Sequence, residues 1–213
     1  MKKYLKLLAP VLYVTSVVFL ILFISFYWQD ILETYYISKI SPNLVKISKD
    51  EISFNGYGTG FYIKAQSGLT YILTNHHVCN LSENDTIFVL EEGKRPVKKR
   101  IIERFLKADL CLIEAPINRE GLALAKSYLK DERVFVLGFP SFMPLTFSSG
   151  SLIGNDELGE FGTTISVLGG NSGSPVLNKY GNVVGVIWGA RIEGAGWAVI
   201  VSLDYIKEFL SVY

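Results

Sequence analysis

The sequence contains few residues of the types that metal sites and disulfide-rich scaffolds require. Only two cysteines and two histidines occur among its 213 residues. A zinc site would have to be built from His76, His77, Cys79 and Cys111, but adjacent histidines rarely converge on one ion and this spacing fits no common zinc pattern. The sequence therefore predicts no metal site and no cofactor.

Neither sign of charge dominates the chain, and no internal repeat or low-complexity segment is present. Three of the 21 basic residues lie at the N-terminal end, which leaves 18 basic against 20 acidic residues in the remainder. This balance gives no reason to expect a nucleic-acid partner. The densest basic stretch, 94–107, alternates with apolar residues, which favours a solvated hairpin face over a binding patch.

One long apolar run stands apart from the rest of the sequence. Residues 7–28 carry no charge and are numerous enough for about 33 Å of helix, the hydrocarbon thickness of a bilayer. Lys2, Lys3 and Lys6 precede the run, so the positive-inside rule places the N-terminus in the cytoplasm. A cleaved signal peptide is the alternative, but bulky residues rather than a small-x-small cleavage site follow the run. The sequence predicts a cytoplasmic tip and transmembrane signal anchor at 1–28.

A linker is expected at 29–43, and from residue 44 onward the pattern changes to short β-type runs separated by turn residues. Six runs precede a connector at 115–130 and six follow it, which is typical of an all-β fold. The expected strands are 45–54, 60–65, 69–74, 86–90, 97–102, 110–114, 133–137, 145–153, 161–167, 175–177, 183–188 and 197–201. A terminal helix is expected at 203–213, because its apolar residues recur at helical spacing.

The segment 169–175, Gly-Gly-Asn-Ser-Gly-Ser-Pro, places the hydroxyl of Ser172 on a glycine-flanked turn. A serine nucleophile needs a base to accept its proton and N–H groups to bind the oxyanion that forms. Two upstream segments contain a candidate base and a carboxylate, Thr-Asn-His-His-Val at 74–78 and Ala-Asp-Leu-Cys-Leu-Ile at 108–113. A plain tight turn is the alternative for a glycine-serine motif that stands alone; the companion segments favour a catalytic site.

These segments, in the order His, Asp, Ser, resemble the trypsin-like (chymotrypsin-fold) serine peptidases. The similarity is closest to the bacterial high-temperature-requirement proteases and glutamyl endopeptidases, without a PDZ domain. It covers about 44–213 and includes Gly-Thr-Gly-Phe at 58–61, Val-Leu-Gly-Phe-Pro at 136–140 and Gly-Val-Ile-Trp-Gly at 185–189. The resemblance implies two packed antiparallel six-stranded barrels, with the catalytic residues at their interface. The first barrel is expected at about 44–114 and the second at about 131–202.

Site residues follow from the same resemblance. It implies that His77 is the general base, Asp109 its orienting carboxylate and Ser172 the nucleophile, with the backbone N–H groups of Gly170 and Ser172 as the oxyanion hole. His77 is preferred to His76 because it alone precedes valine in the Thr-Asn-x-His-Val pattern.

Substrate binding in such peptidases is largely main-chain pairing. The residues that the resemblance places at the substrate are Ser166, Val167, Leu168, Ile187, Trp188 and Gly189. Relatives that select Glu, Arg or Lys carry histidine, threonine or aspartate at these places. The sequence therefore predicts that a small or apolar side chain precedes the scissile bond.

The two cysteines each lie two residues after a predicted member of the triad. A disulfide between Cys79 and Cys111 and a pair of buried free thiols fit the sequence equally well.

The function expected from all of this is a single-pass membrane-anchored serine endopeptidase. It would cleave proteins or peptides on the extracytoplasmic side through an acyl-enzyme, with no nucleic acid involved. The alternative is a peptide-binding or stress-sensing module of the same fold, in which proteolysis is weak or triggered by a regulatory partner.

Overall fold

The computed structural model describes residues 2–51, 57–80, 82, 85–141, 143–155, 161–191 and 197–213. The chain divides into two compact units, one that ends at Lys39 and one over Ile40–Tyr213. The first unit is formed by helix α1 (Lys2–Ile40), and the second contains all the strands.

Helix α1 is continuous through most of the predicted linker and ends where the sequence Ser-Pro follows. A 3₁₀ turn, η1 (Ser41–Asn43), comes directly after it and contains Pro42. The residue before a proline is disfavoured in the α conformation, which explains the helix end. Among the residues that the structure describes, no helix combines the length and the apolar character that crossing a bilayer requires. The predicted transmembrane helix thus has no support from the structure.

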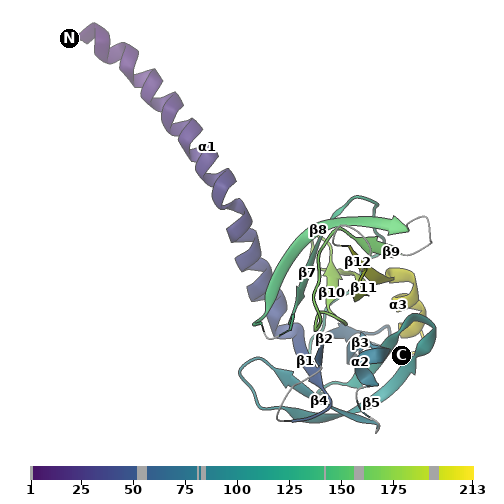
Figure 1. Cartoon of the computed structure of the whole chain (residues 1–213). Coiled ribbons are helices and arrows are strands. Elements are labelled where there is room, and N and C mark those ends of the chain that lie inside the picture. The colour runs from purple at the N-terminus through teal and green to yellow at the C-terminus, as the bar shows by residue number, and fades with distance from the viewer. Residues whose placement is uncertain are drawn as a thin grey trace. The chain divides into compact units, whose positions relative to one another are not determined.

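Two closed antiparallel barrels of six strands each make up most of the second unit (Figure 1). The first barrel has the strand order β1-β2-β3-β6-β5-β4. Its strands are β1 (Leu44–Ser48), β2 (Tyr57–Lys64), β3 (Thr70–Asn75), β4 (Thr86–Glu91), β5 (Val97–Phe105) and β6 (Leu110–Glu114). The predicted all-β fold with two six-stranded barrels is confirmed.

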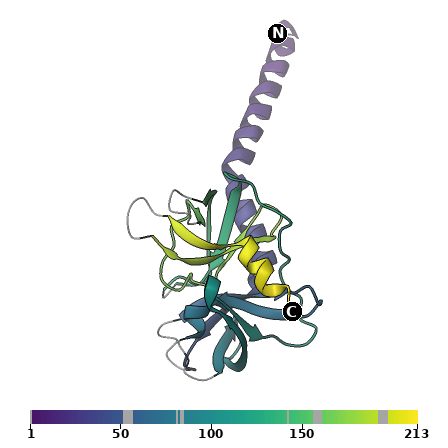
Figure 2. The same ribbon diagram turned by 90° about the vertical axis from the view of Figure 1, so that its right-hand side faces the viewer.

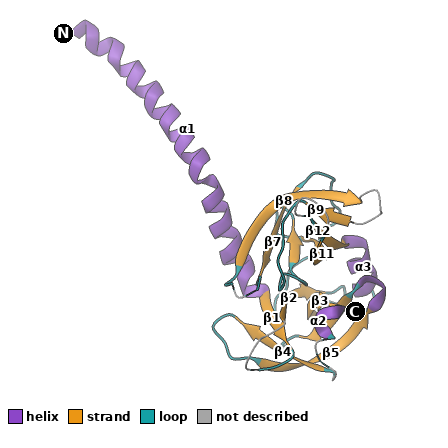
Figure 3. Cartoon of the chain, in the orientation of Figure 1, coloured by secondary structure: helices purple, strands orange, loops and turns teal. Residues whose placement is uncertain are grey.

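The second barrel has the strand order β10-β11-β12-β9-β8-β7. Its strands are β7 (Arg133–Gly138), β8 (Thr146–Asn155), β9 (Phe161–Thr163), β10 (Pro175–Leu177), β11 (Val183–Ala190) and β12 (Ala198–Ser202). Short helical segments complete the unit (Figure 3). They are α2 (His76–Cys79), η2 (Leu106–Ala108) and α3 (Leu203–Leu210).

Two expected strands are longer than the observed ones. The first ends at Ser48 rather than 54, and residues 52–54 of the prediction lie outside the described part of the chain. β9 ends at Thr163, four residues early. Ile165 and Val167 are nevertheless buried in the core of the second barrel. Their alternation with polar residues therefore has the pattern of a strand although no strand forms there. The predicted C-terminal helix is confirmed, although it ends at Leu210.

The two barrels are joined by a connector and by α3. In the connector, Leu122 donates its N–H to the carbonyl of Tyr62 in β2 at 2.7 Å, while Ala123 accepts the N–H of Val183 in β11 at 2.9 Å. The ring of Phe209 in α3 stacks on Phe105 at the end of β5, with centroids 5.0 Å apart. Figure 2 shows α3 lying beside the first barrel, although it follows the last strand of the second. These contacts fix the interface at which side chains from both barrels meet.

A disulfide links Cys79 in α2 to Cys111 in β6, across 32 residues of sequence. Both cysteines are fully buried in the core of the first barrel. The structure thus decides between the two alternatives that the sequence left open. A loop of this length is stabilised by about 3 to 4 kcal/mol in the chain-entropy account of disulfides.

We expect removal of this disulfide to lower the thermal stability of the second unit substantially. The double variant Cys79→Ala/Cys111→Ala should melt about 6 to 16 °C lower, because each kcal/mol shifts Tm by about 2 to 4 °C in a domain of this size. Calorimetry with and without dithiothreitol measures the effect. Reductant should lower the Tm of the wild type and leave that of the double variant unchanged. Equal Tm values for the wild type and the variant would contradict the prediction.

Candidate active site

His77 and Asp109 form a two-point contact across the edge of the first barrel. Nδ1 of His77 lies 2.6 Å from Oδ2 of Asp109, and the backbone N–H of His77 donates to Oδ1 at 2.8 Å. Nδ1 of His76, by contrast, is 3.9 Å from the carboxylate. The imidazole of His77 is 46% exposed, whereas the carboxylate of Asp109 is only 19% exposed. His77 therefore presents its outer edge to solvent and holds its inner edge on Asp109.

The backbone of Asp109 fixes this geometry. Its carbonyl accepts the N–H of His76 at 3.0 Å and the side-chain amide of Asn75 at 3.1 Å. Asp109 follows the 3₁₀ turn η2 and adopts a left-handed conformation with φ of 51°. Aspartate is among the few non-glycine residues that adopt this conformation readily, and such residues cluster at functional sites. The start of α2 and the start of β6 are thus held together by one residue.

Ser172 lies on a loop in which two positions have a backbone conformation that favours glycine. Gly170 has φ of 92° and Gly173 has φ of 85°. A Cβ on Gly173 would lie 2.0 Å from the carbonyl oxygen of Thr59 and 2.3 Å from the hydroxyl oxygen of Thr74. No L side chain fits in this space, so the loop rests directly on strands β2 and β3 of the first barrel.

This close approach brings the nucleophile loop to the His77 segment. The N–H of Thr59 in β2 donates to the carbonyl of Ser172 at 2.8 Å. A Cβ on the neighbouring Gly58 would lie 2.5 Å from Val78, the residue after His77, and 3.1 Å from the carbonyl oxygen of Ser172. The structure therefore gathers the three predicted triad residues at the seam between the barrels.

The backbone N–H groups of Gly170 and Ser172 are available to a ligand. Among the hydrogen bonds between described residues, none uses either of these two donors, although the N–H groups of Asn171, Gly173 and Ser174 are all engaged. The hydroxyl of Ser172 donates to the carbonyl of Trp188 at 3.2 Å. Two unengaged donors beside a serine hydroxyl can bind an oxyanion.

Beyond Ile187, whose carbonyl and N–H bind Gly173 and Ser174, strand β11 has no strand partner on its β10 side among the described residues. β10 pairs with β11 only as far as Val186, and a register shift between Ile187 and Gly189 marks a bulge at Trp188. A Cβ built on Gly189 meets no described atom within 4 Å, so the space over this residue is open. An extended peptide can pair with such an edge through its main chain.

The predicted substrate residues divide into two groups. The side chains of Leu168 and Trp188 are exposed by 61% and 46%, and Ser166 is also exposed. Val167 and Ile187 belong to the core cluster of the second barrel. Their side chains are buried there, so they are not exposed to a substrate as the sequence predicted.

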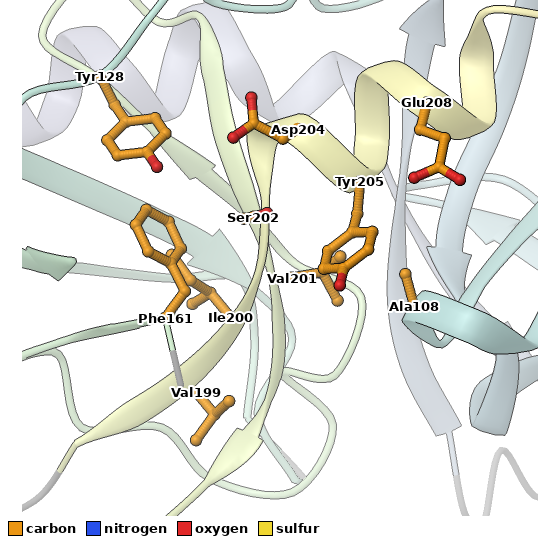
Figure 4. Close-up of a pocket in the computed structure, with 10 residues that line it drawn as sticks. All are labelled: Ala108, Tyr128, Phe161, Val199, Ile200, Val201, Ser202, Asp204, Tyr205 and Glu208. Carbon is orange, nitrogen blue, oxygen red and sulfur yellow. The ribbon is translucent and has the colours of Figure 1, made fainter. Parts of the chain in front are cut away.

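A separate cavity of about 520 Å³ lies between β12, α3 and the residue before Asp109 (Figure 4). The carboxylates of Asp204 and Glu208 and the ring of Tyr205 reach it from α3, while the rings of Tyr128 and Phe161 face each other on another side. None of the predicted triad or substrate residues lines it. In the part of the chain that the structure describes, no cluster of His, Cys, Asp and Glu could hold a metal ion.

Comparisons with known proteins identify the family of the chain. The profile of the trypsin-like peptidase domain family matches residues 58–186, which is more than half of the chain. The chain belongs to the trypsin-like peptidase family. Its peptidase domain extends over both barrels, since the match begins in β2 and ends in β11.

Relatives of the high-temperature-requirement type are found in several organisms. The chain is 28% identical over 167 residues to the mitochondrial serine protease HTRA2 of Drosophila virilis, covering 72% of this chain and 38% of that protein. It is 27% identical over 189 residues to an HtrA-like serine protease of Staphylococcus haemolyticus, covering 76% of this chain and 29% of that protein. The chain thus spans less than two fifths of the length of these relatives.

Solved structures show the same fold. A serine endoprotease from Yersinia pestis matches with a TM-score of 0.70 and 18% identity over 83% of this chain and 64% of that chain. The active form of the Rv3671c protease from M. tuberculosis matches with a TM-score of 0.69 and 21% identity over 85% of each chain.

The sequence analysis overlooked two residues that hold the loop around Ser172, the predicted nucleophile. The hydroxyl of Thr59 donates to the carbonyl of Gly170 at 2.8 Å, and that of Ser141 donates to the carbonyl of Gly169 at 2.7 Å. Thr59 lies within the Gly-Thr-Gly-Phe motif on which the resemblance partly rests, so its position carried a signal. Ser141 directly follows the Val-Leu-Gly-Phe-Pro motif at 136–140, but this motif did not indicate its contact, which spans 28 residues.

Proposed function

We propose that this protein is a serine endopeptidase that cleaves peptide bonds through an acyl-enzyme, with His77, Asp109 and Ser172 as its catalytic triad. The observation that carries the proposal is the convergence of three parts. His77 is held on Asp109, Ser172 lies on a glycine-formed loop, and the N–H groups of Gly170 and Ser172 are unengaged.

The contact with Asp109 determines which nitrogen of His77 acts as the base. An ionised carboxylate only accepts hydrogen bonds, so Nδ1 of His77 carries the proton that points to Asp109. Nε2 is then the nitrogen that accepts a proton from Ser172. Asp109 keeps the ring in this tautomer and stabilises the imidazolium that forms.

Acylation follows from these roles. The Oγ of Ser172 attacks the carbonyl carbon of the substrate while Nε2 of His77 takes its proton, and the resulting oxyanion is bound by the N–H groups of Gly170 and Ser172. The C–N bond then breaks, and His77 delivers the proton to the leaving amine. Water activated by the same histidine hydrolyses the ester and regenerates Ser172.

A second function, a peptide-binding module with weak or triggered cleavage, is favoured by one observation. The hydroxyl of Ser172 donates to the carbonyl of Trp188 rather than to His77. Catalytic hydrogen bonds in ligand-free enzymes are often long or misaligned and tighten when substrate binds. We therefore retain the peptidase as the first proposal and use the reactivity of Ser172 to distinguish the two.

The test of the proposed function is labelling of Ser172 by a fluorophosphonate probe together with casein hydrolysis. Ser172→Ala and His77→Ala should each lose hydrolysis by about 10⁶-fold, since triad members act as a unit. His76→Ala should keep most of the activity, because its ring is 3.9 Å from Asp109 and the ring of His77 occupies the nearer position. Absence of labelling in the wild type would favour the binding module, and near-normal hydrolysis by His77→Ala would refute its assignment as the base.

The proposal extends to the substrate side chain that precedes the scissile bond, which we expect to be small or apolar. Support comes from the residues at the substrate positions, since Leu168 and Trp188 are apolar and exposed and Gly189 leaves open space. An apolar side chain gains about 25 cal/mol for each Å² removed from water, whereas an ionised one without a partner loses several kcal/mol.

Cleavage of a peptide library by the isolated second unit measures this preference. We expect Ala, Val, Leu or Met before the scissile bond. Two variants of Leu168 form a matched pair. Leu168→Ala should weaken the preference for large apolar residues, whereas Leu168→Lys should introduce cleavage after acidic residues. A wild-type preference for Glu or for Arg and Lys would show that the pocket is misassigned.

The cellular location is also a proposal. An uncharged run at 7–28 behind three lysines supports a membrane anchor with the peptidase domain outside the cytoplasm. The disulfide between Cys79 and Cys111 adds support for an oxidising compartment. The anchor itself rests on the sequence alone.

We expect the full chain to fractionate with membranes and to resist extraction by high salt and alkaline carbonate. A C-terminal tag should be digested by protease added to intact spheroplasts. A variant with Leu20→Lys and Ile21→Lys, which places two charges in the apolar run, should move to the soluble fraction. A wild type found in the soluble fraction would exclude the anchor, and a tag protected in intact spheroplasts would reverse the orientation.

A further inference from the structure

The nucleophile loop contains a turn whose type determines where one oxyanion donor points. The N–H of Asn171 donates to the carbonyl of Leu168 at 3.1 Å, which closes a four-residue turn over 168–171. Gly170, at the third position, has φ of 92°. Gly169, at the second position, is not among the residues with positive φ, which excludes a type I′ turn and leaves type II; a type I turn has φ near −90° at the third position.

Type I and type II turns differ in the orientation of their central peptide. In this loop the central peptide joins the carbonyl of Gly169 to the N–H of Gly170. Because a trans peptide is planar, its carbonyl and its N–H point in opposite directions. Rotation of this one peptide into the type I orientation would turn the N–H of Gly170 away from its present direction. The oxyanion hole would then keep only the N–H of Ser172.

Ser141 holds the central peptide in its type II orientation. The carbonyl of Gly169 accepts two hydrogen bonds from this residue, one from the backbone N–H at 2.7 Å and one from the hydroxyl at 2.7 Å. Both would be lost if the peptide rotated. Ser141 itself is on the exposed loop after β7, so it can act on this carbonyl without contributing to the core.

The following peptide is held from the first barrel by Thr59. Its hydroxyl donates to the carbonyl of Gly170 at 2.8 Å and accepts the N–H of Phe139 at 3.0 Å. Thr59 is fully buried. With this neighbouring peptide fixed, the central peptide is the part of the turn that Ser141 controls.

We propose that Ser141 is a positioning residue that keeps the N–H of Gly170 directed into the oxyanion hole, with Thr59 fixing the next peptide. The inference rests on the proposed peptidase activity and adds to it a residue outside the proposed triad. It assigns to Ser141 an effect on turnover through the orientation of one peptide bond.

The variants Ser141→Ala and Ser141→Thr test this role. Ser141→Ala removes one of the two hydrogen bonds to Gly169, so kcat should fall about 3- to 10-fold, the factor expected for one hydrogen bond, while KM and Tm stay unchanged. Ser141→Thr keeps the hydroxyl and should restore kcat. Ser211→Ala is the matched control, because that serine also donates its hydroxyl to a backbone carbonyl at an exposed site, 2.7 Å from Glu208; it should leave kcat unchanged.

The affinity for a peptide boronic acid is a second measurement. It should change if Ser141 orients the oxyanion hole and stay the same if Ser141 has only a structural role. Its tetrahedral adduct uses the oxyanion hole, so the inhibition constant should rise in Ser141→Ala by the same factor by which kcat/KM falls. A crystal structure of Ser141→Ala should show Gly170 with negative φ in part or all of the molecules.

The outcomes separate the inference from the proposed function. If the wild type neither hydrolyses peptides nor reacts with a fluorophosphonate, the proposed function fails, and the φ of Gly170 in Ser141→Ala still decides the role of Ser141. Unchanged kcat in Ser141→Ala, or reduced kcat with φ of Gly170 still near its wild-type value, overturns the inference.

Discussion

The contact between Thr59 and the nucleophile loop is the constraint on which the site depends. Thr59 belongs to the first barrel, yet its N–H binds Ser172 and its hydroxyl binds Gly170, both in the second. Because Gly173 has no side chain, the loop can lie directly against the carbonyl of Thr59. These contacts fix the position of one barrel relative to the other next to the proposed catalytic residues. A shift between the barrels would separate the proposed nucleophile from its base.

Each barrel then prepares one half of the site by local means. In the first, Asp109 binds the backbone and the ring of His77, and the disulfide ties the segments that follow these two residues. In the second, a turn that requires glycine at position 170 leaves two N–H groups unengaged. The energy for this arrangement comes from two apolar cores and from the disulfide, whereas the polar contacts of the site supply orientation.

Short-range patterns were predictable, and contacts across the seam were not. The twelve strands follow from apolar alternation between turn residues, and the amphipathic spacing of Leu203, Ile206 and Phe209 predicted α3. The same alternation wrongly predicted that the strand continues through Ile165 and Val167, which are buried without belonging to a strand. Of the predicted substrate residues, Ile187 also lies in the core. The prediction was made from its position in the sequence near the site, and such a position does not determine which way a side chain points.

The sequence by itself determined the all-β class through apolar periodicity, and its motifs indicated the family and predicted the triad through their resemblance, because periodicity and motifs are local properties of the chain. Only the tertiary structure decided that the cysteines pair, that the N–H groups of Gly170 and Ser172 have no hydrogen-bond partner among the described residues, and that Ser141 donates two hydrogen bonds to the carbonyl of Gly169. These features depend on distances between segments that are 28 or more residues apart in the chain. No pattern within one segment encodes such a distance, since it is set by how the strands and loops of each closed barrel are arranged.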